Sequence, residues 1–185
     1  MDAVEEALRA HPRVSFLPGH LRRYADRDVP LPIGYGQTNS QPSTVARMLR
    51  LLEVPVGGRV LDVGSGSGWT TALLAHLVGP TGLVLGVELD ARLAAWGSAN
   101  LATTEQGWAR IEPAHAGVLG LPDEAPFDRI LVSAEAAQVP DALVDQLKTG
   151  GLMVAPVAAG LCIVRRTASG RDMTRLEGYR FVPLR

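Results

Sequence analysis

Residues 59–69, RVLDVGSGSGW, constrain the fold of this chain more than any other stretch. The apolar run 60–63 is too short for a helix and favours a buried strand. Glycines follow at every second position, and residues 70–78 then repeat apolar side chains at helical spacing before Gly79-Pro80, a typical helix end. We therefore predict a strand-to-helix turn in which a ligand can approach bare backbone at a helix N-terminus.

The spacing of these glycines, G-x-G-x-G, indicates the class of ligand. A dinucleotide fingerprint would place its third glycine where this chain has Trp69, so an NAD-dependent oxidoreductase is disfavoured. A second buried strand is expected at 83–87 and ends at Glu88, whose carboxylate can accept hydrogen bonds from two ribose hydroxyls. We predict a nucleoside-bearing cofactor without a pyrophosphate, with S-adenosylmethionine as the leading candidate. A glycine-rich turn in some other α/β protein is the alternative.

Composition limits the other possibilities. At 185 residues, with 46% hydrophobic and 20% charged residues, the chain fits one ordinary globular domain. The formal net charge of −1 gives no long-range attraction to a polyanion, so we expect no nucleic-acid partner. The four histidines show no metal-ligand spacing, and the lone Cys162 is expected to be buried and inert. No apolar run approaches the ~20 residues that cross a bilayer, so we expect a cytoplasmic protein without a membrane partner.

The rest of the chain alternates between helices and strands. A helix is expected from Asp2 to before Pro12, and another with Val45 and Leu49 on one face ends before Pro55. Between them, residues 11–42 have no sustained period, as in many functional loops. Further along we expect a helix at 89–101, strands at 110–113 and 127–132, a helix at 141–148 stopped by Gly150-Gly151, and strands at 152–156, 161–165 and 175–182. This order predicts an α/β fold with a doubly wound, mostly parallel, seven-stranded sheet and an antiparallel C-terminal edge.

In such a sheet, ligands bind beyond the carboxyl ends of the strands. The groups expected there are the glycine turn, Glu88, residues 114–117 and residues 133–135, with the irregular loop 37–40 available to cover them. The glycine turn, GSGSG, is similar to G-x-S-x-G, but Gly66 takes the central place of a nucleophilic serine, so this match fails. No lysine of a phosphate-binding loop follows, which argues against a nucleotide triphosphatase.

The segment 31–42, LPIGYGQTNSQP, together with the glycine motif resembles the protein-L-isoaspartate O-methyltransferase family. Shorter matches lie at 16–18, 125–128, 146–151 and 180–184. The resemblance implies a Rossmann-like class I methyltransferase that moves a methyl group from S-adenosylmethionine to the α-carboxylate of L-isoaspartyl residues, a step in protein repair. It implies one domain over 1–185, with N-terminal helices and a substrate loop in 1–55 and the cofactor-binding sheet in 56–185. We expect a monomer acting on isoaspartyl-containing proteins or peptides.

By position, the resemblance implies that Ser40 is the catalytic residue; its structural alternative is a helix N-cap. It also implies cofactor contacts at Gln37, Thr38, Gly64, Ser65, Gly66, Glu88, Ala116 and Gly117, and substrate contacts at Ile33, Gly34, Asn39 and Ser133. A carboxylate acceptor is already ionised at pH 7, so the reaction needs alignment rather than a general base.

Three residues depart from the family's usual pattern. Ala116 stands where an acid usually contacts adenine, and the loss of one polar contact costs about 1–3 kcal/mol. Asn39 replaces a usual isoleucine, and Glu135 replaces a small residue beside the pocket. A carboxylate there opposes an anionic substrate unless it is turned away. Two alternatives stay open: a methyltransferase for a different peptide or small-molecule carboxylate, and a non-catalytic descendant with weakened cofactor binding.

Overall fold

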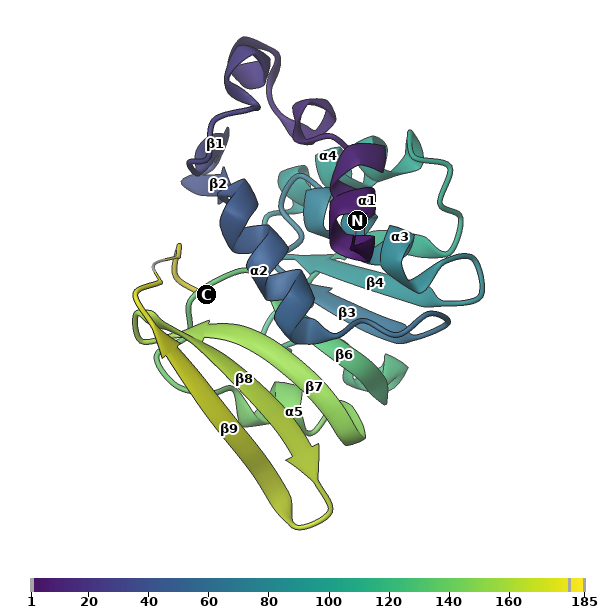
Figure 1. Cartoon of the computed structure of the whole chain (residues 1–185), viewed down its shortest axis with the longest axis vertical. Helices are drawn as coiled ribbons and strands as arrows, with labels where there is room; N and C mark the ends of the chain where they lie inside the picture. The colour runs from purple at the N-terminus through teal and green to yellow at the C-terminus, as the bar shows by residue number, and fades with distance from the viewer. Residues whose placement is uncertain (1, 180, 185) are drawn as a thin grey trace.

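The computed structural model describes residues 2–179 and 181–184. Its centre is a seven-stranded sheet with the strand order β5-β4-β3-β6-β7-β8-β9 (Figure 1). The strands are β3 (Arg59–Val63), β4 (Leu83–Glu88), β5 (Ala109–Pro113), β6 (Phe127–Val132), β7 (Leu147–Val157), β8 (Gly160–Thr167) and β9 (Gly170–Glu177). Strands β5, β4, β3, β6 and β7 run parallel; β8 pairs antiparallel with β7, and β9 pairs antiparallel with β8. The predicted fold class is confirmed.

Helices cover both faces of this sheet because alternate side chains of each strand point to opposite faces. Val60 of β3 belongs to one hydrophobic cluster, and its neighbour Leu61 belongs to the other. The first cluster is covered by α1 (Ala3–Ala10), α2 (Pro42–Leu52), α3 (Trp69–Val78) and α4 (Ala91–Ala102), and the second by the short α5 (Asp141–Val144). The central strands β3, β4 and β6 are therefore largely buried on both sides, as their continuous apolar runs predict, whereas the edge strand β5 exposes Arg110.

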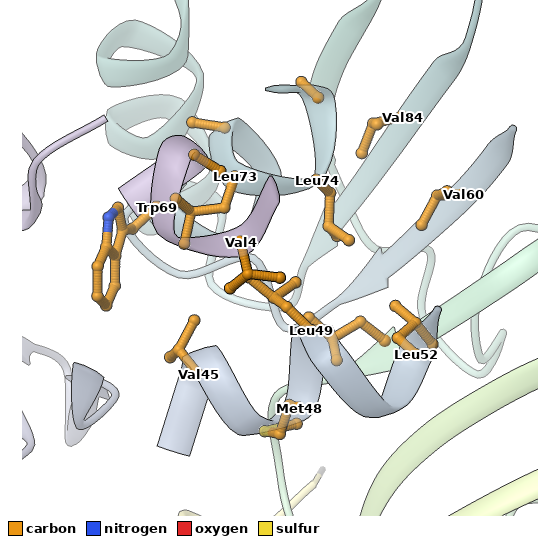
Figure 2. Packing of buried hydrophobic residues seen from close by; sticks show 14 of the residues in the cluster. Val4, Val45, Met48, Leu49, Leu52, Val60, Trp69, Leu73, Leu74 and Val84 are labelled. Carbon is orange, nitrogen blue, oxygen red and sulfur yellow. The ribbon is translucent and has the colours of Figure 1, made fainter. Parts of the chain in front are cut away.

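The first cluster fixes the N-terminal helices on the sheet (Figure 2). Val4 of α1 lies beside Leu49 of α2, and Leu52 at the end of α2 and Val60 of β3 belong to the same cluster. Helix α3 is apolar nearly all round, because it is covered by α1 on one side and the sheet on the other. This packing holds the start of α3, and with it the glycine turn, in one place.

The segment 11–42 is more ordered than its irregular sequence predicts. It contains the 3₁₀ helices η1 (Arg13–Phe16) and η2 (Gly19–Tyr24) and a hairpin of β1 (Leu31–Gly34) and β2 (Gln37–Asn39). The hairpin turns through Gly34, Tyr35 and Gly36, which have φ values of 95°, 53° and 73°. Pro32 and these glycines conceal the strand pattern in the sequence, since both residue types are rare in strands.

Two expected boundaries at the C-terminal end are wrong. Helix α5 ends at Val144, and Leu147 already pairs with Phe127 as the start of β7, so Gly150 and the next glycine lie inside a strand. Leucine spacing misled the prediction, because buried helix and strand positions call for the same residues. The last strand is β9 at Gly170–Glu177 rather than 175–182; of that expected range, Arg180 lies outside the described residues.

Within residues 2–179 and 181–184, no helix combines the length and the apolar character needed to span a membrane.

Candidate active site

A cavity of about 460 Å³ lies beyond the carboxyl ends of β3, β4 and β6. This volume is typical of a small-molecule or cofactor site. Its walls come from the glycine turn, from the ends of β4 and β6, from the loop after β5, from β2 with Ser40, and from residues 182–184 near the C-terminus. The position is the one expected for ligands of an open α/β sheet. All the predicted site residues line this cavity except Gly34, which lies at the end of β1.

The glycine turn forms one wall through its backbone. Gly64, Gly66 and Gly68 have φ values of 83°, 53° and 88°, a left-handed conformation that side-chain-bearing residues rarely adopt. The N–H groups of Gly64 and Ser65 both donate to the carbonyl oxygen of Val87, at 2.9 and 3.1 Å. The turn is therefore joined directly to the end of the neighbouring strand.

Asp62 of β3 connects the sheet to the start of α3. Its Oδ2 accepts hydrogen bonds from the hydroxyls of Thr70 and Thr71, at 2.8 and 2.7 Å. Its Oδ1 is the one buried side-chain polar atom without a partner in the described part of the chain. Burial raises the pKa of Asp62, the hydrogen bonds from the two threonines partly offset this rise, and the resulting pKa is about 6.

Glu88 stands at the tip of β4, as predicted, and only 7% of it is exposed. Its Oε2 accepts a hydrogen bond from the N–H of Gly66 at 2.9 Å, and its Oε1 accepts one from the N–H of Asp90 at 3.1 Å. Each carboxylate oxygen has two lone pairs, so acceptor capacity remains on the cavity side. The side chain is thus oriented by backbone donors while still able to bind the hydroxyls of a ribose.

Ser40 lies between β2 and α2, on the wall opposite the glycine turn. The structural alternative for this residue is wrong, because the N-cap of α2 is Gln41, and the carboxylate of Asp28 accepts from the N–H of Ser43 in the first turn at 2.8 Å. Neither the hydroxyl nor the N–H of Ser40 has a hydrogen-bond partner among residues 2–179 and 181–184. Both groups of this half-buried residue are therefore available to a ligand.

Asn39 joins the two walls. Its side-chain Nδ2 donates to the hydroxyl of Ser67 at 3.0 Å, and its Oδ1 accepts from Nε of Arg13 at 2.7 Å. All three side chains are buried. Ile33 adds an apolar contact, since its Cδ1 lies 3.2 Å from the place where a Cβ on Gly66 would be. The hairpin and the glycine turn are thus packed together, and Asn39 is part of the site's framework.

The other two departures have different consequences. Ala116 is exposed and lines the cavity beside Gly117, so no carboxylate stands at that position. Glu135 does not line the cavity. Its two carboxylate oxygens accept from the N–H groups of Ala159 and Phe181, at 3.2 and 3.3 Å. The carboxylate is therefore turned toward the β7–β8 hairpin and the C-terminal segment.

Two features of the site escape sequence reasoning. Val182, Pro183 and Leu184 line the cavity; the match of residues 180–184 to the family was the available signal, but it assigned them no role. Trp69 donates from Nε1 to the carbonyl oxygen of His11 at 2.9 Å, which holds the start of η1 against the start of α3. The sequence signal for the contact between Trp69 and His11 was the presence of a large side chain directly after the glycines.

A doubly wound sheet with an antiparallel C-terminal edge, whose G-x-G-x-G turn and strand-end acid share one cavity, is the fold of a class I S-adenosylmethionine-dependent methyltransferase. Within this class, the chain belongs to the protein-L-isoaspartate(D-aspartate) O-methyltransferase family, whose model matches residues 1–185.

Relatives at the sequence level carry the same name. The protein-L-isoaspartate O-methyltransferase of Aeropyrum pernix is 44% identical over 98% of this chain and 72% of its own length. The one from Anaeromyxobacter dehalogenans is 46% identical over 100% of this chain and 88% of its own. The chain therefore matches most of each relative.

Solved structures agree. A protein-L-isoaspartate O-methyltransferase superposes with a TM-score of 0.91 at 25% identity; all of this chain is covered, and it spans 62% of that one. A Plasmodium falciparum protein described as a protein-L-isoaspartate O-methyltransferase, in complex with S-adenosyl-L-homocysteine, gives a TM-score of 0.87 at 26% identity, covering 100% and 91% of the two chains.

Proposed function

We propose that this chain transfers a methyl group from S-adenosylmethionine to the α-carboxylate of L-isoaspartyl residues in damaged proteins or peptides. The observation that carries the proposal is the single cavity in which Ser40 and the segment 37–40 face the glycine turn and Glu88. Membership of the family and the names of the relatives support the same reaction.

The residues present fit the cofactor. Glu88 would bind the two ribose hydroxyls, because its carboxylate is held by backbone donors and keeps free lone pairs. The backbone of Gly64–Gly66 would lie along the methionine part, and Gln37 and Thr38 would contact it from the opposite wall. Ala116 and Gly117 would flank the adenine. When bound, the cofactor supplies an electrophilic methyl group on a positively charged sulfur.

The protein's own part in the reaction is to bind and align the acceptor. The α-carboxylate is ionised at neutral pH and is itself the nucleophile, so no residue has to remove a proton. The hydroxyl and N–H of Ser40 can hold one carboxylate oxygen without neutralising it, while Ile33, Ser133 and the C-terminal residues 182–184 exclude water. In this arrangement Ser40 is the catalytic residue.

The chemistry after transfer needs no further residue. The following backbone nitrogen attacks the new ester carbonyl, methanol leaves, and a succinimide forms. Water then opens the succinimide to aspartate or to isoaspartate, and the latter can be methylated again. The single-domain division at residue 55, the monomeric state, the absence of a nucleic-acid partner and the cytoplasmic location stay predictions.

The test is calorimetric titration with S-adenosylhomocysteine, followed in the same sample by an isoaspartyl peptide and by its aspartyl twin. Micromolar binding of the cofactor product, with a further response to the isoaspartyl peptide alone, is expected. Cofactor binding with indifference to both peptides would identify a methyltransferase for another carboxylate. Absence of cofactor binding would identify the non-catalytic descendant and refute the proposal.

A further inference from the structure

Arg13 is a buried cation without an anionic partner in the described part of the chain. Only 5% of it is exposed, yet every hydrogen bond from its guanidinium goes to a neutral oxygen. Nε donates to Oδ1 of Asn39, Nη1 to the carbonyl of Arg27 at 3.1 Å, and Nη2 to the carbonyls of Val29 and Asn39 at 2.9 and 2.8 Å. Burying a charge in this way is costly, which suggests that the charge has a use.

The guanidinium lies one peptide group from Ser40. Nη2 of Arg13 binds the carbonyl oxygen of Asn39, whose carbon is bonded to the nitrogen of Ser40. This peptide is trans, so its N–H points opposite to its C=O, away from Arg13. A cation on the carbonyl oxygen polarises the amide and makes the Ser40 N–H a stronger donor. That N–H has no partner among the described residues, and Ser40 lines the cavity.

Asn39 keeps this charge from being neutralised. An aspartate has the same shape and would form a buried ion pair with Arg13, whereas the asparagine amide fills the position with no net charge. Burial lowers the pKa of Arg13 to about 10, so the guanidinium is protonated at neutral pH. The charge of Asp28 raises the pKa of Arg13, but this carboxylate is exposed and already bound to Ser43 and Gln41.

We infer that Arg13 is a positioning residue for the acceptor: its unneutralised charge, preserved by Asn39, polarises the 39–40 peptide and selects an anionic carboxylate at Ser40. The inference rests on the proposed function and explains why the site would bind a carboxylate in preference to an uncharged acceptor. It predicts that the site discriminates a carboxylate from an uncharged group of the same shape, and that this discrimination depends on the net charge of the Arg13–Asn39 pair.

The test uses Asn39→Asp with two peptides, the isoaspartyl peptide and its twin carrying an α-carboxamide. The variant keeps the acceptor oxygen for Arg13, and the Ser67 hydroxyl can donate to the second oxygen. With S-adenosylhomocysteine present, the preference for the carboxylate over the carboxamide should fall by about tenfold, as expected for a charge of this proximity at an intermediate dielectric. Binding of the carboxamide peptide should not change, and the melting temperature should rise.

Asn39→Ala is the matched control. It removes the side-chain contacts to Arg13 and Ser67 but leaves the cation unneutralised, so it should lower the melting temperature while keeping the carboxylate preference within about twofold. A purely structural role for Asn39 predicts the reverse pattern, with the alanine variant losing more peptide affinity than the aspartate variant.

Each remaining result has a definite meaning. Equal weakening of both peptides in Asn39→Asp, or no change in either, would overturn the inference about Arg13 alone, provided that the wild-type protein prefers the isoaspartyl peptide to its aspartyl twin. A wild-type protein that does not distinguish these two would refute the proposed function, and the inference with it.

Discussion

The two walls of the cavity are held in place by different means. The glycine turn is fixed by backbone hydrogen bonds to Val87 and by close contact with α4, where a Cβ on Gly97 would lie 2.6 Å from the carbonyl oxygen of Gly66. The hairpin wall with Ser40 is held by side chains, chiefly Arg13, Asn39 and Ile33. The first wall is part of the sheet architecture, whereas the second depends on contacts between side chains. We therefore expect a single substitution in the glycine turn to weaken cofactor binding strongly, and a single substitution in the hairpin wall to weaken acceptor binding only moderately.

The largest effect should come from Gly97→Ala, which tests the rigidity of the cofactor wall. The new Cβ would be 2.6 Å from Gly66 O and 3.3 Å from Gly68 N, and neither backbone atom can move freely. We expect at least ~100-fold weaker binding of S-adenosylhomocysteine and a loss of about 1–3 kcal/mol in unfolding free energy. Gly107→Ala is the control, since nothing lies within 4 Å of its Cβ position. Near-normal titration of the Gly97 variant would show that the turn is adaptable.

Glu88→Gln should have the next largest effect. The carboxylate accepts from the N–H of Gly66 and of Asp90, and a glutamine must turn its own NH₂ toward one of these donors. Leaving one donor unsatisfied and removing the charge should weaken S-adenosylhomocysteine by about 10- to 100-fold in calorimetry. Glu112→Gln, on the adjacent strand β5 and outside the cavity wall, should bind normally. Equal affinity in both variants would remove Glu88 from the proposed cofactor site.

Ser40→Ala tests the acceptor wall by itself. Loss of the hydroxyl should lower kcat/KM for an isoaspartyl peptide by about tenfold, because the N–H of Ser40 remains to hold the carboxylate. The dissociation constant of S-adenosylhomocysteine should stay the same, which steady-state assays paired with titration would check. Ser98→Ala, at an exposed position of α4, should match the wild type in both measurements. If only the affinity for S-adenosylhomocysteine changed, Ser40 would be a cofactor-binding residue rather than one that holds the acceptor.

The smallest expected effect is a gain from Ala116→Asp. The position is exposed at the cavity edge, so a new carboxylate there can accept one hydrogen bond from the adenine or ribose in competition with water. Such a contact is worth about 0.5–1.5 kcal/mol, or a three- to tenfold increase in S-adenosylhomocysteine affinity. Ala95→Asp on the exposed side of α4 should give no gain. A loss of affinity at position 116 would show that the loop after β5 is arranged differently around the ligand.

Local patterns made much of the sheet predictable. Strands β3, β4 and β6 and the turn after β3 were expected within a residue or two, because a buried parallel strand and a glycine turn each need particular residues in sequence. The helix expected at 141–148 was wrong for the same reason: Leu143, Val144 and Leu147 are all buried, and burial alone does not distinguish helix from strand. The β1–β2 hairpin was missed because its turn needs glycines that otherwise indicate a loop.

By itself, the sequence determined the strand-turn-helix that forms the cofactor wall, the acid at the tip of the next strand, and, through the segment 31–42, the family. Those features depend on neighbours along the chain. Only the tertiary structure decided that Arg13 lies against Asn39, 26 residues away, that Glu135 turns from the cavity, and that residues 182–184 complete it. The physical reason is that a buried polar side chain takes whichever partner the packed fold brings within hydrogen-bond distance, and that choice leaves no periodic pattern in the sequence.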